Sequence, residues 1–167
     1  MALTSKQFYT RLKPENLASR KKPRHTIREL AFLKRMLRKG DRILDLACGY
    51  GRITIPLAKQ GYNVEGIDIT PVLIRKARAT AKREKLDVKF RLGDMRHLPY
   101  KNSSFDAIIC IWSAFFEMRN IREQRKAVKE MLKALSIGGS AFMDLPIIEK
   151  FGPERKSRYR WSADAFI

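Results

Sequence analysis

The sequence has few cysteines and no long hydrophobic run. Only Cys48 and Cys110 are cysteines among 167 residues, and each lies in or beside an apolar segment, which argues against a disulfide framework or a metal knuckle. No apolar stretch approaches the length that crosses a bilayer. The opening segment, MALTSKQFYTRLKPENLASRKKPRH, also lacks the apolar core of a signal peptide. These absences predict a cytoplasmic globular protein without a metal site.

Acidic residues are scarce as well. There are 17 Asp and Glu against 36 Lys and Arg, which gives a formal net charge of +19. Such an excess makes a polyanionic partner worth considering. The basic side chains are spread over several segments, however: SRKKPRH, IRKARATAKREK and REQRKAVKEMLK. Positive charge that is distributed over several segments more often forms a solvated surface than a binding face. Nucleic-acid binding is therefore kept as an alternative and not as the first interpretation.

What the sequence does contain is an alternation of short apolar runs with amphipathic segments. RILDLA is typical of a buried strand, and NVEGID, VKFRLGD, FDAIICIW and SAFMDLP follow it as further strands. Helices are expected from Thr26, from within a residue or two of Gly51, from Pro71 to about Lys85, and over residues 120 to 135. This alternation predicts an α/β fold with a parallel sheet of about five strands and helices on both faces.

Two glycines one residue apart, Gly49 and Gly51, separate the first strand from its helix in ILDLACGYGRITIPLA. A backbone without side chains indicates that something comes close to this turn. A dinucleotide-binding turn typically has a third glycine, and this sequence has Thr54 at that position. In addition, the carboxylate of Asp45 would repel a pyrophosphate. Asp45 could instead hold an ammonium group. S-adenosylmethionine carries an ammonium and a sulfonium but no phosphate, and therefore fits the local charge better.

Two further acids come at the ends of the next two strands. Asp68 could accept hydrogen bonds from both ribose hydroxyls, a role that both cofactor classes share. Asp94 could accept one from the exocyclic amine of adenine, with Met95 and Ile69 flanking the ring. A single acid at such a position is as readily a helix cap or a loop residue. Three acids at three successive strand ends, beside a glycine turn, are much harder to explain in that way.

Three segments resemble successive motifs of the class I S-adenosylmethionine-dependent methyltransferases. They are ILDLACGYGRITIPLAKQGYNVEGIDITPVLIRKARATAK, VKFRLGDMRHLPYKNSSFDAIICIWSAFF and LKALSIGGSAFMDLP. The resemblance implies a Rossmann-like domain over residues 26 to 146, preceded by a basic arm or lid at 1 to 25 and followed by a basic tail at 147 to 167. The chain departs from the family in lacking the last strands of the usual seven-stranded sheet, and in having Ala47 and Arg52 at two glycine positions of the motif.

The resemblance also implies the cofactor contacts. The corresponding positions are Asp45, Ala47, Cys48, Gly49, Gly51, Asp68, Ile69, Asp94, Met95, Ile111 and Trp112. Ile111 would offer its backbone carbonyl to the amino group of the cofactor, and Trp112 would lie beside the transferring methyl. No side chain is assigned as catalytic, because methyl transfer needs alignment more than it needs an acid or a base.

Three functions remain open from the sequence. The first is methyl transfer from S-adenosylmethionine to a small molecule. The second is RNA methylation, which the net charge favours, although CIWSAFF replaces the Asn-Pro-Pro-Tyr type of motif used for base amines. The third is a non-catalytic cofactor-binding or partner subunit, since the short carboxyl end leaves no evident acceptor pocket. Either the chain is a fragment, or its fifth strand is an edge that needs cover from another subunit, and for that reason we expect self-association there.

Overall fold

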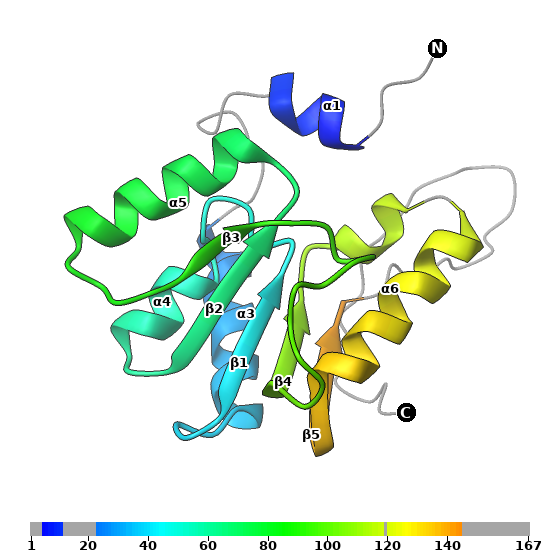
Figure 1. Ribbon diagram of the computed structural model, residues 1–167. Coiled ribbons are helices and arrows are strands. Elements are labelled where there is room, and N and C mark those ends of the chain that lie inside the picture. The colour runs from blue at the N-terminus through cyan, green and yellow to red at the C-terminus, as the bar shows by residue number, and fades with distance from the viewer. Residues whose placement is uncertain (1–4, 12–22, 119, 145–167) are drawn as a thin grey trace, which may run out of the picture.

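Five parallel strands form the centre of the molecule (Figure 1). The computed structural model describes residues 5–11, 23–118 and 120–144. The strands lie in the order β3-β2-β1-β4-β5, and every neighbouring pair is parallel, which confirms the predicted α/β sheet. Their bounds are β1 Arg42–Leu46, β2 Asn63–Asp68, β3 Phe90–Leu92, β4 Phe105–Cys110 and β5 Leu135–Met143. The predicted tail over 147–167 and most of the predicted arm lie outside the described residues.

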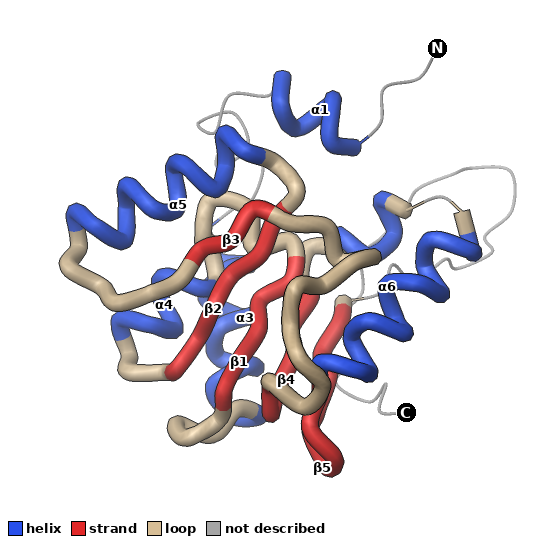
Figure 2. The backbone as a smooth tube through the Cα atoms, in the orientation of Figure 1, coloured by secondary structure: helices blue, strands red, loops and turns tan. Residues whose placement is uncertain are grey.

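Helices cover both faces of this sheet, as the tube in Figure 2 shows. On one face lie α3 (Pro23–Met36), α4 (Thr54–Lys59) and α5 (Pro71–Arg83). On the other lies α6 (Ile121–Ala134), beside the loop 93–104. The short helix α1 (Ser5–Arg11) and the 3-10 helix η1 (Ala114–Glu117) lie near the carboxyl ends of the strands.

The alternation of side chains along β1 explains the two layers. Ile43 packs with Leu33 of α3 on one face, whereas Leu44 packs with Met131 of α6 on the other. All four side chains are buried. A strand that is covered on both sides needs an unbroken apolar run, which is what RILDLA supplies. At roughly 1.5–3 kcal/mol for each large side chain removed from water, this burial is a main source of the sheet's stability.

Two helices begin elsewhere than the sequence predicts. Helix α3 begins at Pro23 instead of Thr26, because proline is favourable in a first helical turn. Helix α4 begins at Thr54, slightly later than predicted, because residues 49–53 form turns. Pro56 still lies in the first turn of α4, where its missing N–H breaks no helical bond.

The fifth strand begins earlier than the predicted segment SAFMDLP. Strand β5 starts at Leu135 and contains both Gly138 and Gly139. The pairing with β4 shifts register between Phe105 and Ala107, so the glycines lie in a bulge. A side chain at Gly139 would come within 2.9 Å of the carbonyl oxygen of Asp106, which explains the glycine.

Strand β5 is an edge of the sheet within the part of the chain that the structure describes. It has no buried residue, unlike the neighbouring β4, and the side chain of Ile137 is fully exposed. Among the helices of the described residues, none combines the length and the apolar character needed to span a membrane.

Candidate functional site

The turn after β1 brings the backbone into left-handed conformations. Ala47, Gly49 and Gly51 have φ angles of 55°, 57° and 85°. A side chain on Gly51 would meet the Cδ1 atom of Ile55 at 2.8 Å and the Cζ atom of Phe90 at 3.1 Å. The chain's own packing therefore accounts for Gly51. A side chain on Gly49 would meet only Leu73, at 3.9 Å, so the space above Gly49 is open to a ligand.

Asp45 lies in β1 just before this turn and is 3% exposed. The hydroxyl of Thr54, the first residue of α4, donates a 2.6 Å hydrogen bond to its Oδ2 atom. Burial raises the pKa of Asp45 to about 7, although the Thr54 hydroxyl and the positive charge of Arg52 act in the opposite direction. Asp45 is thus a buried acid close to its titration point, and a cationic group beside it would favour the ionised form.

Asp68 ends β2 and is held from two sides by backbone. Its Oδ2 atom accepts a hydrogen bond from the N–H of Gly49 at 2.9 Å, and its Oδ1 atom accepts one from Thr70 at 2.8 Å. Burial raises the pKa of Asp68, which these two N–H groups partly offset. Each carboxylate oxygen keeps a further lone pair, so this acid can accept hydrogen bonds from two ligand hydroxyls.

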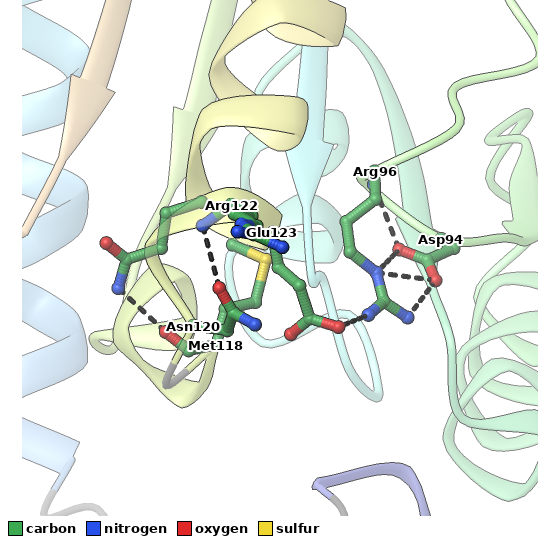
Figure 3. A network of polar contacts seen from close by, with 7 residues as sticks. Asp94, Arg96, Met118, Asn120, Arg122 and Glu123 are labelled. Carbon is green, nitrogen blue, oxygen red and sulfur yellow. Dashed lines mark hydrogen bonds and ion pairs between the residues drawn. The ribbon is translucent and has the colours of Figure 1, made fainter.

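Asp94 follows β3 and is engaged by an arginine (Figure 3). The guanidinium of Arg96 donates to both carboxylate oxygens, at 2.5 to 3.0 Å, and also pairs with Glu123 of α6. Burial tends to raise the pKa of Asp94, but the hydrogen bonds and charge of Arg96 outweigh it and hold the pKa below its usual value. Met95, next in sequence, packs against the core that α6 covers, and Ile69 is half-buried. The roles predicted for these residues stay predictions.

The chain leaves β4 through two strained residues. Ile111 is buried, and Trp112 and Ser113 then take φ angles of 75° and 53°, which non-glycine residues rarely adopt. The carboxylate of Asp144 accepts a 2.6 Å hydrogen bond from the N–H of Ser113 and thereby helps to hold this conformation. Strain of this kind clusters at ligand sites.

Sequence reasoning missed a buried ion pair that borders the turn. Arg52 follows Gly51 directly, and its guanidinium pairs with Glu29 of α3. It also donates a 2.9 Å hydrogen bond to Thr26 and lies 5.4 Å from the ring centre of Trp112. One signal was available, because Glu29 is the single acid among the apolar residues of its helix.

Helix α1 lies above the carboxyl ends of the strands (Figure 1). The Tyr9 hydroxyl donates a 3.3 Å hydrogen bond to Glu117 of η1, across the mouth of the site. The arm or lid predicted for residues 1–25 stays a prediction, and residues 12–22 of it lie outside the described part.

Two surface hollows, of about 270 and 320 Å³, lie instead by the amino ends of the strands. Arg42 and Arg91 line the first, but each is already paired with an acid, Asp106 and Glu65 respectively. Open parallel sheets bind ligands at the carboxyl ends of their strands, where Asp45 and Asp68 lie. The candidate site is therefore the carboxyl edge around β1, β2 and β4.

Comparison with known proteins gives a consistent result. A family model described as a methyltransferase domain matches residues 43–139. Demethylmenaquinone methyltransferase of Renibacterium salmoninarum is 34% identical over 116 residues, which are 70% of this chain and 46% of that protein. The chain spans less than half the length of the curated relatives it matches.

Solved structures agree with that match. A crystal structure from Pyrococcus horikoshii has a TM-score of 0.66 and 31% identity, over 81% of this chain and 64% of that one. A structure from Methanosarcina mazei, described as an S-adenosylmethionine-dependent methyltransferase, has a TM-score of 0.59 and 30% identity, over 63% of this chain and 52% of its own.

Proposed function

Because the chain belongs to the class I S-adenosylmethionine-dependent methyltransferases, we propose that it transfers a methyl group from S-adenosylmethionine to a small-molecule acceptor. The observation that carries this proposal is the pair of buried acids, Asp45 and Asp68, on either side of the open turn at Gly49. A pyrophosphate would be repelled by this pair, whereas a ligand with an ammonium group and two ribose hydroxyls matches it.

The residues of the site fit this cofactor. Asp45 would hold the ammonium group, and the methionine chain would lie over Ala47, Cys48 and Gly49. Asp68, already oriented by backbone N–H groups, would accept the ribose hydroxyls. An ammonium beside Asp45 also offsets the burial that raises the pKa of that acid.

The remaining contacts concern the adenine ring and the reacting end. Asp94, Met95 and Ile69 would surround adenine, where Arg96 fixes the carboxylate of Asp94. Ile111 would offer its carbonyl to the amino group of the cofactor, and Trp112 would lie beside the methyl group. The left-handed backbone at Trp112 supports this placement, because it turns the chain sharply where β4 ends.

Catalysis in this site would come from alignment. When bound, the cofactor supplies an electrophilic methyl group on a positively charged sulfur. The protein would hold the acceptor in line with that methyl and exclude water, and positioning of this kind supplies roughly 7–11 kcal/mol in favourable systems. A general base is needed only if the acceptor must lose a proton early. No side chain of this chain is assigned that role.

A small-molecule acceptor is supported by the similarity to demethylmenaquinone methyltransferases, as those relatives are named. The first test is calorimetric titration with S-adenosylmethionine and with NAD, using the wild type and Asp68→Ala. We expect binding of S-adenosylmethionine alone, lost in the variant. Binding of NAD, or of neither ligand, would refute the proposed cofactor. Cofactor binding without turnover on any small-molecule extract would instead favour a non-catalytic subunit.

RNA is a second candidate acceptor, favoured by one surface. Five exposed basic side chains line the outer side of α6, namely Arg122, Arg125, Lys126, Lys129 and Lys133. Such a row could contact phosphates, and binding would then weaken steeply with salt. Retention of tRNA at low salt, lost when Arg125, Lys126 and Lys129 are changed to Glu, would support this candidate. Equal binding by the variant would remove it.

We also propose that the protein self-associates through β5. Two observations support this proposal: β5 is an edge strand of the sheet in the described residues, and the side chain of Ile137 is fully exposed. Sedimentation of a strict monomer at high concentration would contradict the proposal.

A cytoplasmic location is proposed as well. The two buried free thiols, Cys48 and Cys110, suit a reducing compartment. Recovery of the protein from the extracellular fraction would contradict this location.

A further inference from the structure

Helix α6 exposes a stripe of large apolar side chains. The stripe is formed by residues seven and four positions apart, which lie on one side of a helix: Ile121, Val128 and Leu132. These residues are 59%, 36% and 66% exposed. A single exposed apolar residue needs no explanation, but three along one side of a helix indicate a contact surface.

Basic side chains lie directly beside this stripe. They form a basic row made of Arg122, Arg125, Lys126, Lys129 and Lys133, all exposed. Around the helix axis, Arg125 is about 40° and Lys129 about 80° from Ile121, at 3.6 residues per turn. Lys133 is paired with Glu130, whereas the other four form no ion pair within the described residues. The row and the stripe therefore share one exposed surface of α6.

The two acids of α6 are turned away from this surface. Glu123 pairs with Arg96, as Figure 3 shows, and Glu130 accepts a 3.1 Å hydrogen bond from the N–H of Leu98. Both contacts are made with the loop 93–104, on the side of the helix opposite the stripe. The exposed surface of α6 is thus apolar and positive, without an acid of its own.

The other described helices do not combine these two features. Helix α5 has an exposed basic side as well, with Arg75, Lys76 and Lys82, but it has no large exposed apolar side chain among the described residues. Helix α3 exposes Ile27 and Phe32, but these are five positions apart and so lie on different sides of the helix. Helix α5 therefore provides an internal control for the effect of charge alone.

The combination of charge and apolar area indicates the kind of partner. RNA phosphates would match the basic row but would leave the apolar stripe in water. A second copy of this chain could cover the stripe, but it would bring two positive rows together, which is unfavourable. At an anionic membrane surface, the basic side chains contact the headgroups while the apolar side chains enter the boundary with the acyl chains.

We propose that the exposed surface of α6 docks on a membrane surface that contains anionic phospholipids. The contact is peripheral, because α6 has 14 residues and crossing a bilayer takes about 20. The helix would lie along the plane of the membrane, with its stripe inserted among the headgroups. This inference does not depend on the proposed function, since no residue of the candidate site takes part in the contact.

Co-sedimentation of the full chain with lipid vesicles tests the proposal. Vesicles of phosphatidylcholine and phosphatidylglycerol in equal amounts are compared with vesicles of phosphatidylcholine alone, at physiological salt. The quantity to measure is the partition coefficient between vesicles and buffer. Sedimentation without vesicles and retention of tRNA are measured on the same proteins, so that a protein or an RNA partner would be recognised.

Two variants isolate the contribution of charge. R125Q/K126Q/K129Q removes three charges from α6, and the matched control R75Q/K76Q/K82Q removes three from α5, which covers the opposite face of the sheet (Figure 1). Both variants have the same net charge, so a difference between them reports the position of the charge. All the substituted residues are exposed, and thermal unfolding checks that each variant is folded.

A third variant, I121Q/V128Q/L132Q, removes the stripe and keeps every charge. Its control is Ile27→Gln, a change at an exposed apolar residue of α3. Because glutamine is a good helix former, neither change should disturb its helix. This pair of proteins isolates the apolar part of the contact.

We expect the wild type to bind the anionic vesicles and not the neutral ones. Loss of the three α6 charges should weaken binding on the order of 100-fold, which is about fivefold per charge. The α5 control should weaken it by no more than about threefold, because charges beyond a Debye length of about 8 Å are screened. Loss of the stripe should weaken it about tenfold or more, while Ile27→Gln leaves it unchanged.

Several results would overturn the proposal. One is a wild type that does not bind anionic vesicles. Equal losses in the α5 and α6 charge variants would show attraction by the net charge alone. An unchanged partition coefficient in the stripe variant would exclude insertion, and tRNA retention lost only in the α6 charge variant would then assign the basic row to RNA. A dimer without vesicles that the stripe variant abolishes would assign the stripe to a second copy.

Discussion

The carboxylate of Glu29 and the guanidinium of Arg52 form a buried ion pair that joins helix α3 to the turn after β1. The two residues are 23 positions apart in sequence. Their contact couples helix α3 to the carboxyl edge of the sheet.

Loss of one partner of this pair should destabilise the protein strongly. Glu29→Ala leaves the guanidinium uncompensated in a buried position, and we expect a loss of about 3–5 kcal/mol in the free energy of unfolding. Denaturant titration measures it. The matched control is Lys133→Ala, which removes an exposed ion pair with Glu130 and should lose at most about 1 kcal/mol. Similar losses in both variants would contradict this reading of the pair.

Asp45 should make the ligand-free protein less stable as pH rises. Its pKa is about 7 in the folded chain against an ordinary 3.8, so the folded state keeps a proton that the unfolded state releases. Stability should therefore fall between about pH 4 and pH 7, by an amount on the order of 4 kcal/mol from this group. Unfolding free energies of the wild type and Asp45→Asn, measured at pH 5 and pH 8, test this. The pH slope of the variant should be clearly smaller, and parallel slopes would refute the assignment.

The two glycines of the turn should respond differently to alanine. Gly51→Ala combines a left-handed backbone with a clash against Ile55, and we expect it to lose more stability than Gly49→Ala, for which the backbone penalty is about 1 kcal/mol. Adding Ile55→Val, which removes the clashing Cδ1 atom, should restore part of the loss in the first variant only. Gly49→Ala should act mainly on S-adenosylmethionine affinity, measured by calorimetry. Equal stability losses without an effect on affinity would contradict this division.

Ile137 should matter for association and not for folding. Its side chain is fully exposed on β5, so Ile137→Lys should change the free energy of unfolding by no more than about 0.5 kcal/mol. The same change places a charge at the edge strand and should lower the sedimentation coefficient at high concentration if β5 pairs with a second copy. Ile27→Lys, at another exposed apolar position, is the control and should leave sedimentation unchanged. Identical behaviour of the two variants would remove β5 as the contact.

Much of the fold follows from the sequence because the strands are buried on both faces. Runs such as RILDLA have no other stable environment in a chain of this size, and the helices between them dictate parallel pairing. The bulge in β5 was not foreseeable in the same way. Two adjacent glycines, such as Gly138 and Gly139, are common in turns. Only the close approach of the Asp106 carbonyl oxygen to Gly139 requires a glycine within the strand.

The sequence predicts the parts of the candidate site that lie at strand ends. It does not predict the contacts between residues that are far apart in the chain. Asp45 and Asp68 lie at the carboxyl ends of neighbouring strands, as their positions after apolar runs indicate. Sequence periodicity places Glu29 on a helix but does not reveal its partner in a separate turn. Nor does it distinguish a glycine with open space beside it, Gly49, from one that a neighbouring side chain requires, Gly51.

Under the proposed function, the strand order divides the carboxyl edge of the sheet into one half that would bind the cofactor and one half that would bind the acceptor. The β1 to β3 half carries Asp45, Asp68 and Asp94, which would bind the cofactor. The β4 to β5 half carries Trp112 and the chain beyond it, where an acceptor would enter. Such a layout is modular: a new acceptor specificity can arise by substitutions after β4 while the cofactor cradle stays intact. Arg52 contacts Trp112, so a substitution after β4 that moves Trp112 would also affect the turn after β1.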